Sequence, residues 1–137
     1  MRRGWQQRVH RHKFGWVSGV FHSTKSSKPI RYKSRLELMV CRYLDDNPRV
    51  ATYYYEAVKL PYVVSLDGKA LRRNYLPDFI IQFTDNTREM WEVKPLRETT
   101  NPINVGKFKS GYAFCKKYGI QFRILTESTI ANLLRGV

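Results

Sequence analysis

The stretch YLPDFIIQFTDNTREMWEVKP, residues 75–95, holds two apolar, strand-like runs on either side of a turn. Aromatic and β-branched residues bounded by Asp, Asn and Thr are typical of a β-hairpin. Three charged residues interrupt the apolar pattern: Asp78 opens the first run, and Glu92 and Lys94 close the second. A hairpin of core residues therefore ends in two carboxylates and an ammonium group.

The alternation of side chains along a strand predicts where these charges lie. If the turn contains three residues, Phe79 lies opposite Trp91, and this aromatic pair faces the core. Asp78 then lies opposite Glu92 on the other face, at the end far from the turn, and Lys94 shares that face. A turn of two or four residues would shift the pairing and break the arrangement.

Asp78 and Glu92, placed opposite each other, would repel unless a cation lies between them or one is protonated. Oxygen ligands in this arrangement suit Mg²⁺ or Mn²⁺, with positions left for water and for a phosphate oxygen. Lys94 beside them would orient the water or stabilise charge on the phosphate. The alternative is a cross-strand ion pair between Lys94 and one carboxylate.

The composition indicates one basic globular domain with a polyanionic partner. The 137 residues include 25 Lys or Arg and 11 Asp or Glu, a formal net charge of +14. Such a charge favours nucleic acid as the partner, and a basic structural protein is the alternative. Ten of the basic residues and none of the acidic ones fall in residues 1–36, so the charge is concentrated near the N-terminus.

Residues 1–33 are expected to form a basic, partly extended N-terminal arm, and residues 34–137 the folded domain. Aromatic residues in the arm alternate with Arg, Lys and His. The cations would contact DNA phosphates and the rings would stack on bases, unless the aromatics pack back onto the domain. The cations expected on DNA are Arg2, Arg3, Arg8, Arg11 and Lys13.

Two helices are predicted around the strands. Ser34 is a good N-cap, and Glu37 completes a capping box that begins a helix over residues 34–48. The Lys-rich residues 103–119 form the second helix, with Gly119 as its C-cap. Its expected buried face is Val105, Phe108, Tyr112 and Cys115, while Lys107 and Lys109 are phosphate contacts or part of a solvated face. The predicted order is helix, three or four strands, helix, strand, helix.

Cys41 and Cys115 fall among apolar residues in these two helices, so buried free thiols are expected rather than a disulfide. No stretch is long and apolar enough to span a membrane, and no signal-peptide pattern follows the basic start. We therefore expect an intracellular, cytoplasmic protein without a membrane partner, associated with the virion if it is phage-encoded.

The residues PD at 77–78, followed by EVK at 92–94, resemble the signature of the PD-(D/E)xK nuclease superfamily. YKSRLELMVCRYLD, NPRV, the Lys-rich helix and FRILTES extend the likeness. Roughly residues 30–130 most resemble the amino-terminal endonuclease domain of TnsA and are similar to the small head-completion nucleases of tailed phages. The resemblance implies an α/β fold with a restriction-endonuclease-like core, a mixed β-sheet flanked by helices in αβββαβ order. The TnsA pattern normally continues into a winged-helix domain, which this sequence lacks, so a free-standing nuclease fits equally well.

The resemblance also implies the residues of the site. Asp78, Glu92 and the backbone carbonyl of Val93 would be metal ligands, and Lys94 the catalytic lysine. Glu37 would reach the metal directly or through water, although its place in the capping box explains it as well. Glu56 is a further candidate carboxylate, with a surface charge as the alternative.

The expected function is a metal-dependent DNA endonuclease that uses Mg²⁺, with Mn²⁺ as a substitute, and leaves a 5′-phosphate. The alternative is a non-catalytic DNA-binding or structural module of a phage or transposition assembly on a nuclease scaffold. RNA is a weaker alternative substrate. Two cuts in a duplex need two sites, so a homodimer or a partner protein is expected for double-strand cleavage.

Overall fold

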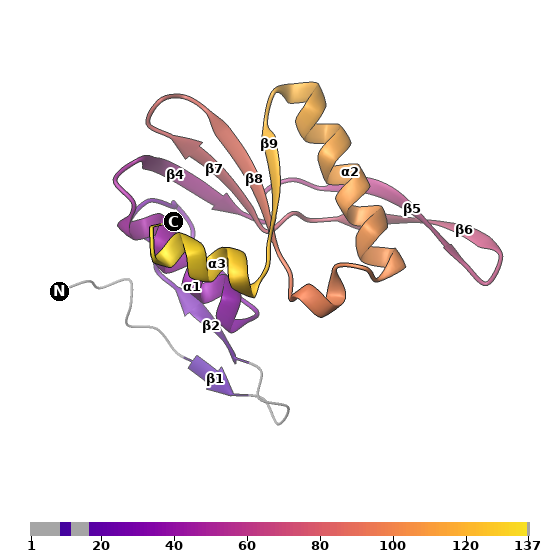
Figure 1. Cartoon of the computed structure of the whole chain (residues 1–137), viewed down its shortest axis with the longest axis horizontal. Helices are drawn as coiled ribbons and strands as arrows, with labels where there is room; N and C mark the ends of the chain where they lie inside the picture. The colour runs from indigo at the N-terminus through magenta and orange to yellow at the C-terminus, as the bar shows by residue number, and fades with distance from the viewer. Residues whose placement is uncertain (1–8, 12–16, 137) are drawn as a thin grey trace.

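A four-stranded mixed sheet forms the centre of the computed structural model, which describes residues 9–11 and 17–136 (Figure 1). Its strands, in spatial order, are β4 (Val50–Tyr55), β7 (Phe79–Phe83), β8 (Arg88–Val93) and β9 (Gln121–Leu125). The first three are antiparallel neighbours, and β9 runs parallel to β8. A parallel neighbour requires a crossover, which the short 3-10 turn Leu96–Glu98 and helix α2 (Pro102–Tyr118) provide.

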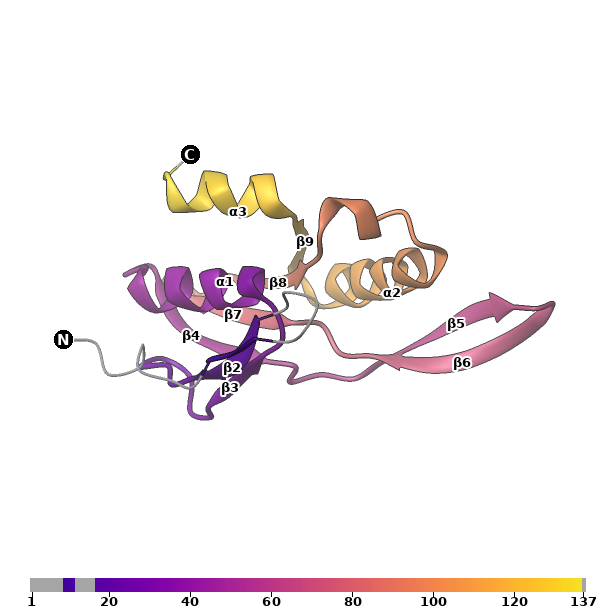
Figure 2. The same ribbon diagram turned by 90° about the horizontal axis from the view of Figure 1, so that it is seen from below.

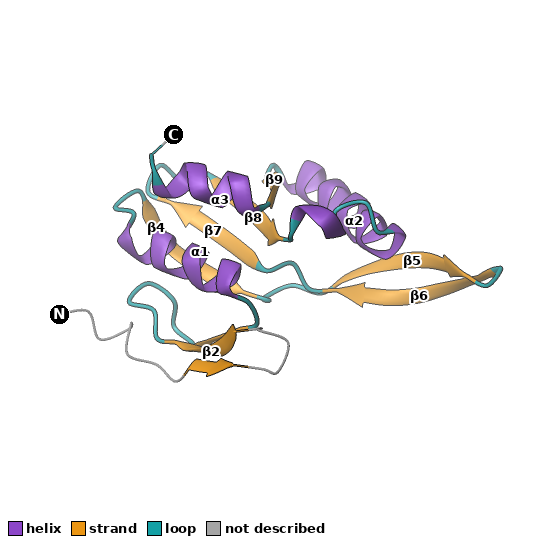
Figure 3. Cartoon of the chain, turned by 60° about the horizontal axis from the view of Figure 1, so that its bottom comes forward, coloured by secondary structure: helices purple, strands orange, loops and turns teal. Residues whose placement is uncertain are grey.

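Helices cover both faces of this sheet. α1 (Arg35–Asp46) and α3 (Glu127–Leu134) lie side by side over one face, where Phe79 and Trp91 join the main core (Figure 3). α2 covers the other face, where Cys115 packs with Met90. The order α1, β4, β7, β8, α2, β9 confirms the expected α/β class with a restriction-endonuclease-like core in αβββαβ order.

The quoted hairpin has the register that alternation predicts. Phe79 pairs with Trp91, and the N–H of Phe83 donates to the carbonyl of Thr87 at 2.9 Å. The turn therefore contains three residues and ends at Asn86, whose φ of +69° is the left-handed conformation typical of such turns. The odd turn length was the condition for Asp78 to face Glu92, and it is met.

Residues 17–33 are part of the folded body, so the expected boundary at residue 33 does not mark a break in packing. β2 (Val17–Phe21) pairs with β1 (Val9–Arg11) and with β3 (Ile30–Tyr32) in a small antiparallel sheet. Four of its side chains are buried in the same core as α1: Val17, Phe21, Ile30 and Tyr32. The segment packs onto the domain because burying its apolar side chains, which lie between cations along the sequence, is favourable.

A second hairpin leaves the central sheet between β4 and β7. β5 (Leu60–Leu66) and β6 (Lys69–Tyr75) form a two-stranded sheet of their own. Asp67 and Gly68 make the turn with φ values of +51° and +74°, as their sequence predicts for a tight hairpin. Its tip projects beyond α2 in Figures 1 and 2.

α2 buries only part of the face expected for it: Cys115 is buried, and Val105 and Phe108 are partly buried. Tyr112 is 61% exposed, so its predicted burial is wrong, whereas Gly111 and Cys115 are buried. The helix comes so close to β9 that a Cβ at Gly111 would lie 2.7 Å from the ring of Phe122. A glycine, which a hydrophobic pattern does not mark, therefore sits at the centre of this contact.

The expectations for the two helix caps and for the cysteines are met. Ser34 caps α1 through its Oγ, which accepts from the N–H of Glu37 at 3.1 Å, and Gly119 caps α2 with a φ of +68°. Cys41 and Cys115 are both buried and free. None of the helices in the described residues is long and apolar enough to cross a membrane.

Candidate active site

Asp78 and Glu92 hold each other in place across two neighbouring strands. Glu92 lies near the end of β8, and Asp78 lies directly before β7. The N–H of Val93 donates to Oδ2 of Asp78 at 2.7 Å, and the N–H of Asp78 is 3.3 Å from Oε1 of Glu92. Asp78 is only 7% exposed and Glu92 only 3%. The structure thus brings together the two carboxylates predicted to share a site.

Both carboxyl groups bind a proton more tightly than ordinary side chains do. Burial raises the pKa of Asp78 well above its usual range, and the charges of Glu92 and Glu37 raise it further. Burial also raises the pKa of Glu92, against the lowering effects of Tyr75, Lys94 and Lys107. Negative charge at this position is therefore costly unless a cation offsets it.

Lys94 stands beside this pair. Its Nζ lies 3.6 Å from Oε2 of Glu92, and its side chain is 20% exposed. Its backbone N–H donates to the carbonyl of Leu125 at 2.9 Å, which fixes the end of β8 against β9. The ion-pair distance exceeds the roughly 2.7–2.9 Å of a charge-assisted hydrogen bond, so the ammonium group is near Glu92 without being locked to it.

Tyr75 is a member of the site that the sequence reasoning missed. Its hydroxyl donates to Oε1 of Glu92 at 2.6 Å. Burial raises the pKa of Tyr75, so the phenol keeps its proton and remains a donor. Strand alternation gave no sign of this contact because Tyr75 belongs to the neighbouring hairpin, and Leu76 and Pro77 interrupt the strand before Asp78.

Glu37 is buried at the start of α1, where it has a structural role. Its Oε1 accepts from the N–H of Lys33 at 2.8 Å and from the hydroxyl of Tyr55 at 2.7 Å. In a standard capping box, the glutamate would accept from the N–H of the N-cap residue, here Ser34. Glu37 accepts instead from the N–H of Lys33, one position earlier. Its charge nevertheless raises the pKa of Asp78, so its carboxylate is close enough to influence the pair.

The carboxylates do not form a ready-made cage for an ion. In the part of the chain that the structure describes, no three His, Cys, Asp or Glu side chains gather as a metal-binding cluster. Still, no described residue donates a hydrogen bond to Oδ1 of Asp78 or to Oε2 of Glu92. Two carboxylate oxygens and the carbonyl of Val93 are hard ligands, and they suit a cation that keeps several of its waters. The residues present therefore fit Mg²⁺ or Mn²⁺.

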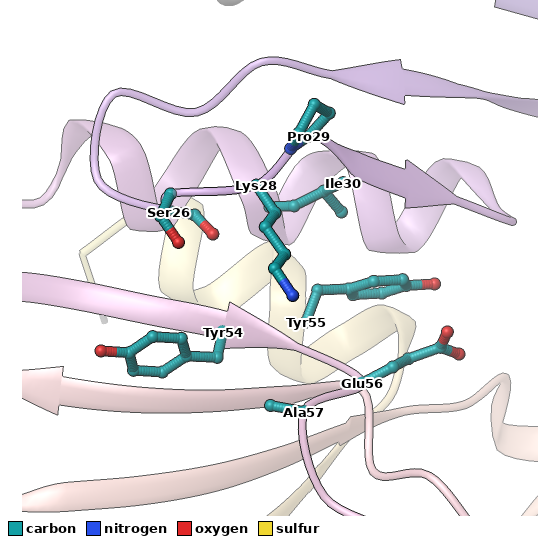
Figure 4. A pocket seen from close by; sticks show the side chains of 9 residues that line it. Ser26, Lys28, Pro29, Ile30, Tyr54, Tyr55, Glu56 and Ala57 are labelled. Atoms are coloured by element: carbon teal, nitrogen blue, oxygen red, sulfur yellow. The ribbon is translucent and has the colours of Figure 1, made fainter.

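Glu56 connects the site to a neighbouring pocket. Its N–H donates to the carbonyl of Asp78 at 3.0 Å, and its carboxylate forms a 2.6 Å ion pair with Lys33. Residues 26–30 and 54–57 line a pocket of about 430 Å³, into which the side chain of Lys28 extends toward β4 (Figure 4). Glu56 is thus a partly buried charge, paired with Lys33, at the edge of the site.

The cations predicted to contact DNA are only partly visible. The charge of Lys107, in α2, lowers the pKa of Glu92, so this lysine lies near the site, while Lys109 is exposed. Four of the predicted N-terminal cations lie outside the described residues: Arg2, Arg3, Arg8 and Lys13. Of Arg11, only the position in β1 is described.

Comparison with known proteins shows the family to which this sequence is related. The family described as "TnsA-like endonuclease N terminal" matches residues 47–127, more than half of the chain. The match includes both strands of the quoted hairpin, and with them Asp78, Glu92 and Lys94. The protein named "Head completion nuclease" from Enterobacteria phage T4 is 28% identical over an alignment of 128 positions, and the match covers 77% of this chain and 84% of that protein.

Proposed function

Since the chain belongs to the family of TnsA-like endonuclease N-terminal domains, we propose that it is a metal-dependent endonuclease that hydrolyses phosphodiester bonds in DNA. The observation that carries this proposal is the buried, interlocked pair of Asp78 and Glu92, with the ammonium group of Lys94 beside it. A merely structural ion pair needs one carboxylate, and a second buried one adds repulsion.

Asp78, Glu92 and the carbonyl of Val93 would hold a divalent cation, Mg²⁺ or Mn²⁺. Such a cation supplies positive charge that offsets the charge of the phosphate and makes bound water more acidic. Lys94 would orient the attacking water and donate a hydrogen bond to the phosphate as negative charge develops there. Tyr75 keeps the carboxylate of Glu92 in one orientation.

Glu37, in α1, adds negative charge near the proposed cation site. Because Oε1 is held by Lys33 and Tyr55, Oε2 is the oxygen that remains to bind a water molecule of the hydrated cation. Lys107 would contact a phosphate next to the one that is cut, from the start of α2. These roles rest on the placement of the two side chains around Glu92 and Asp78.

A panel of DNA substrates tests the proposal. Supercoiled, linear, branched and single-stranded DNA are incubated with the full chain in Mg²⁺, in Mn²⁺ and in EDTA. We expect cleavage of at least one substrate with either metal, products that carry a 5′-phosphate, and no cleavage in EDTA. Salt-sensitive binding without cleavage under any condition would contradict the proposal and favour a non-catalytic DNA-binding module.

The two strands of a duplex run in opposite directions, and one site cuts one strand at a time. A concerted double-strand cut therefore requires a second copy of the chain or a partner protein, for example from a phage or transposition assembly. The ratio of nicked to linear product from supercoiled DNA, measured against protein concentration, distinguishes a single site from a pair.

A further inference from the structure

The projecting hairpin β5–β6 has two different faces. On the inner face, Leu60, Tyr62, Val64 and Tyr75 are buried and form a small core with Ile103 and Phe114 of α2. The outer face is exposed along its whole length: Pro61 pairs with Asn74, Val63 with Arg72, and Ser65 with Ala70. Nothing in the described part of the chain covers it, and Val63 is 64% exposed.

The hairpin carries an excess of positive charge. Residues 59–75 contain four basic residues and one acidic residue, Asp67. The basic residues are Lys59, Lys69, Arg72 and Arg73. All four are exposed, and none forms an ion pair within the described segments. Charges at a free sheet edge also discourage aggregation, but that purpose does not require them to share one sign.

We propose that this hairpin lies in the major groove of duplex DNA, with the outer face against the bases. The inference rests on the proposed function, since it assigns the form of DNA that the nuclease binds. The major groove of B-form DNA is about 12 Å wide and admits a two-stranded β-ribbon. Arg72 and Asn74 are two positions apart on the outer face, and arginine and asparagine are the side chains that commonly bind guanine and adenine edges.

The composition of the outer face selects duplex DNA over the other nucleic acids. It has small and polar side chains with one arginine, and no aromatic ring on which an unpaired base would stack. The major groove of duplex RNA is deep and narrow, so a ribbon of this kind does not enter it. Lys59 and Lys69, at opposite ends of the hairpin, are placed to contact phosphates.

The inner face of the hairpin is held at its base to the strand that carries Glu92, and along its length to α2. Tyr75, the last residue of β6, donates its hydroxyl hydrogen bond to Glu92. At Gly106, a Cβ would lie 3.4 Å from the ring of Tyr62, which shows how closely α2 approaches β5. The hydroxyl of Ser110 also donates to the carbonyl of Pro61 at 3.1 Å.

Binding measurements in EDTA test the proposal without any need for cleavage. The full chain, its Arg72→Ala/Asn74→Ala variant and the control Lys116→Ala are titrated into a fluorescent duplex and into a single strand of equal length. Lys116 is an exposed lysine in the last turn of α2, and Figure 1 shows that this end of the helix lies away from the hairpin. We expect the double variant to lose about tenfold or more in duplex affinity, with little change for single strands, and the control to bind as wild type.

Protection of guanine N7 from dimethyl sulfate locates the contact, because this atom lies in the major groove. Wild type is expected to protect guanines that the double variant leaves reactive. Equal duplex affinity and equal protection in both proteins would overturn the proposal, as would an equal loss on duplex and single strand. Hairpin-dependent binding without cleavage would contradict only the proposed nuclease activity, and cleavage with hairpin-independent binding would contradict only this inference.

Discussion

The hydroxyl of Tyr75 donates a 2.6 Å hydrogen bond to Oε1 of Glu92, and so joins the base of the projecting hairpin to the candidate metal site. The same oxygen lies 3.3 Å from the N–H of Asp78. One oxygen of Glu92 is therefore occupied by protein donors, and Oε2 faces Lys94. This division fixes the orientation of Glu92 through Oε1 and leaves Oε2 for the proposed cation.

Tyr75→Phe removes this donor with little change in volume. Burial raises the pKa of Glu92 and the Tyr75 hydroxyl lowers it, so the variant should raise that pKa further. A smaller fraction of Glu92 is then ionised at low pH, and the acidic limb of the pH–rate profile shifts to higher pH. At about pH 6 we expect a loss of about tenfold in cleavage rate, which shrinks toward about pH 9. Tyr62→Phe, on the inner face of the same hairpin, is the control, and coincident acidic limbs for all three proteins would contradict the role of Tyr75.

Asp78→Asn should stabilise the metal-free protein. A raised carboxyl pKa means that the folded state binds the proton more tightly than the unfolded state, so stability falls as pH rises from the ordinary carboxyl pKa through the folded one. Asparagine has no charge to bury and still accepts from the N–H of Val93. In EDTA at about pH 8 we expect its Tm to exceed that of wild type by about 4 °C or more, with the difference gone near pH 4.

Asp85→Asn is the control, because the pKa of Asp85 is lowered whereas that of Asp78 is raised. The hydroxyl and N–H of Thr87 donate to Asp85 and hold its pKa below the usual value, so its contribution to stability is lost as pH falls. That variant should gain nothing at high pH. A lower Tm for Asp78→Asn than for wild type at about pH 8 in EDTA would contradict this prediction. It would show that protein groups stabilise the ionised carboxylate of Asp78 without a metal ion.

Glu37→Gln separates the electrostatic role of Glu37 from its structural one. Glutamine still accepts from the N–H of Lys33 and the hydroxyl of Tyr55, so the Tm should stay at or above that of wild type. If Oε2 binds water of the cation, cleavage should fall by about 10²-fold or more. Ser34→Ala removes the N-cap instead, and should cost about 1 kcal/mol of stability without slowing cleavage below its Tm. If Glu37→Gln cleaves DNA at the wild-type rate, Glu37 has only its structural role at the start of α1 and takes no part in cleavage.

The pairing of Asp78 with Glu92 was predictable because one condition, an odd turn length, decides the faces of both strands. The apolar side chains of β7 and β8 then leave a single register that buries Phe79 and Trp91. The two helices were predictable from Ser34 and Gly119, since capping residues act locally. In each case the sequence signal lies within a few residues of the structure that it predicts.

The features that escaped prediction depend on contacts across long stretches of chain. Phe21 is buried because β2 and β3 fold back onto α1, which is the alternative that the sequence left open for the aromatics of the arm, whereas the burial of Ile30 was not predicted. α2 contacts β9 through Gly111, which has no side chain and so leaves no hydrophobic signal in the sequence. The neighbouring Tyr112 was therefore predicted to be buried, although it is exposed. Tyr75 reaches Glu92 from a different sheet, and no local periodicity records such a contact.

Lys94→Ala gives the most direct test of the central claim, that Asp78, Glu92 and Lys94 form a metal-dependent hydrolytic site. Cleavage of the best DNA substrate is measured in Mg²⁺ and Mn²⁺ for wild type and variant, and DNA affinity is measured in EDTA. We predict a loss of about 10³-fold or more in cleavage rate with either metal, measured below the Tm, and a DNA affinity within about twofold of wild type. The Tm in EDTA should fall, because the charge of Lys94 beside Asp78 and Glu92 is lost. Cleavage by Lys94→Ala at the wild-type rate would contradict the account.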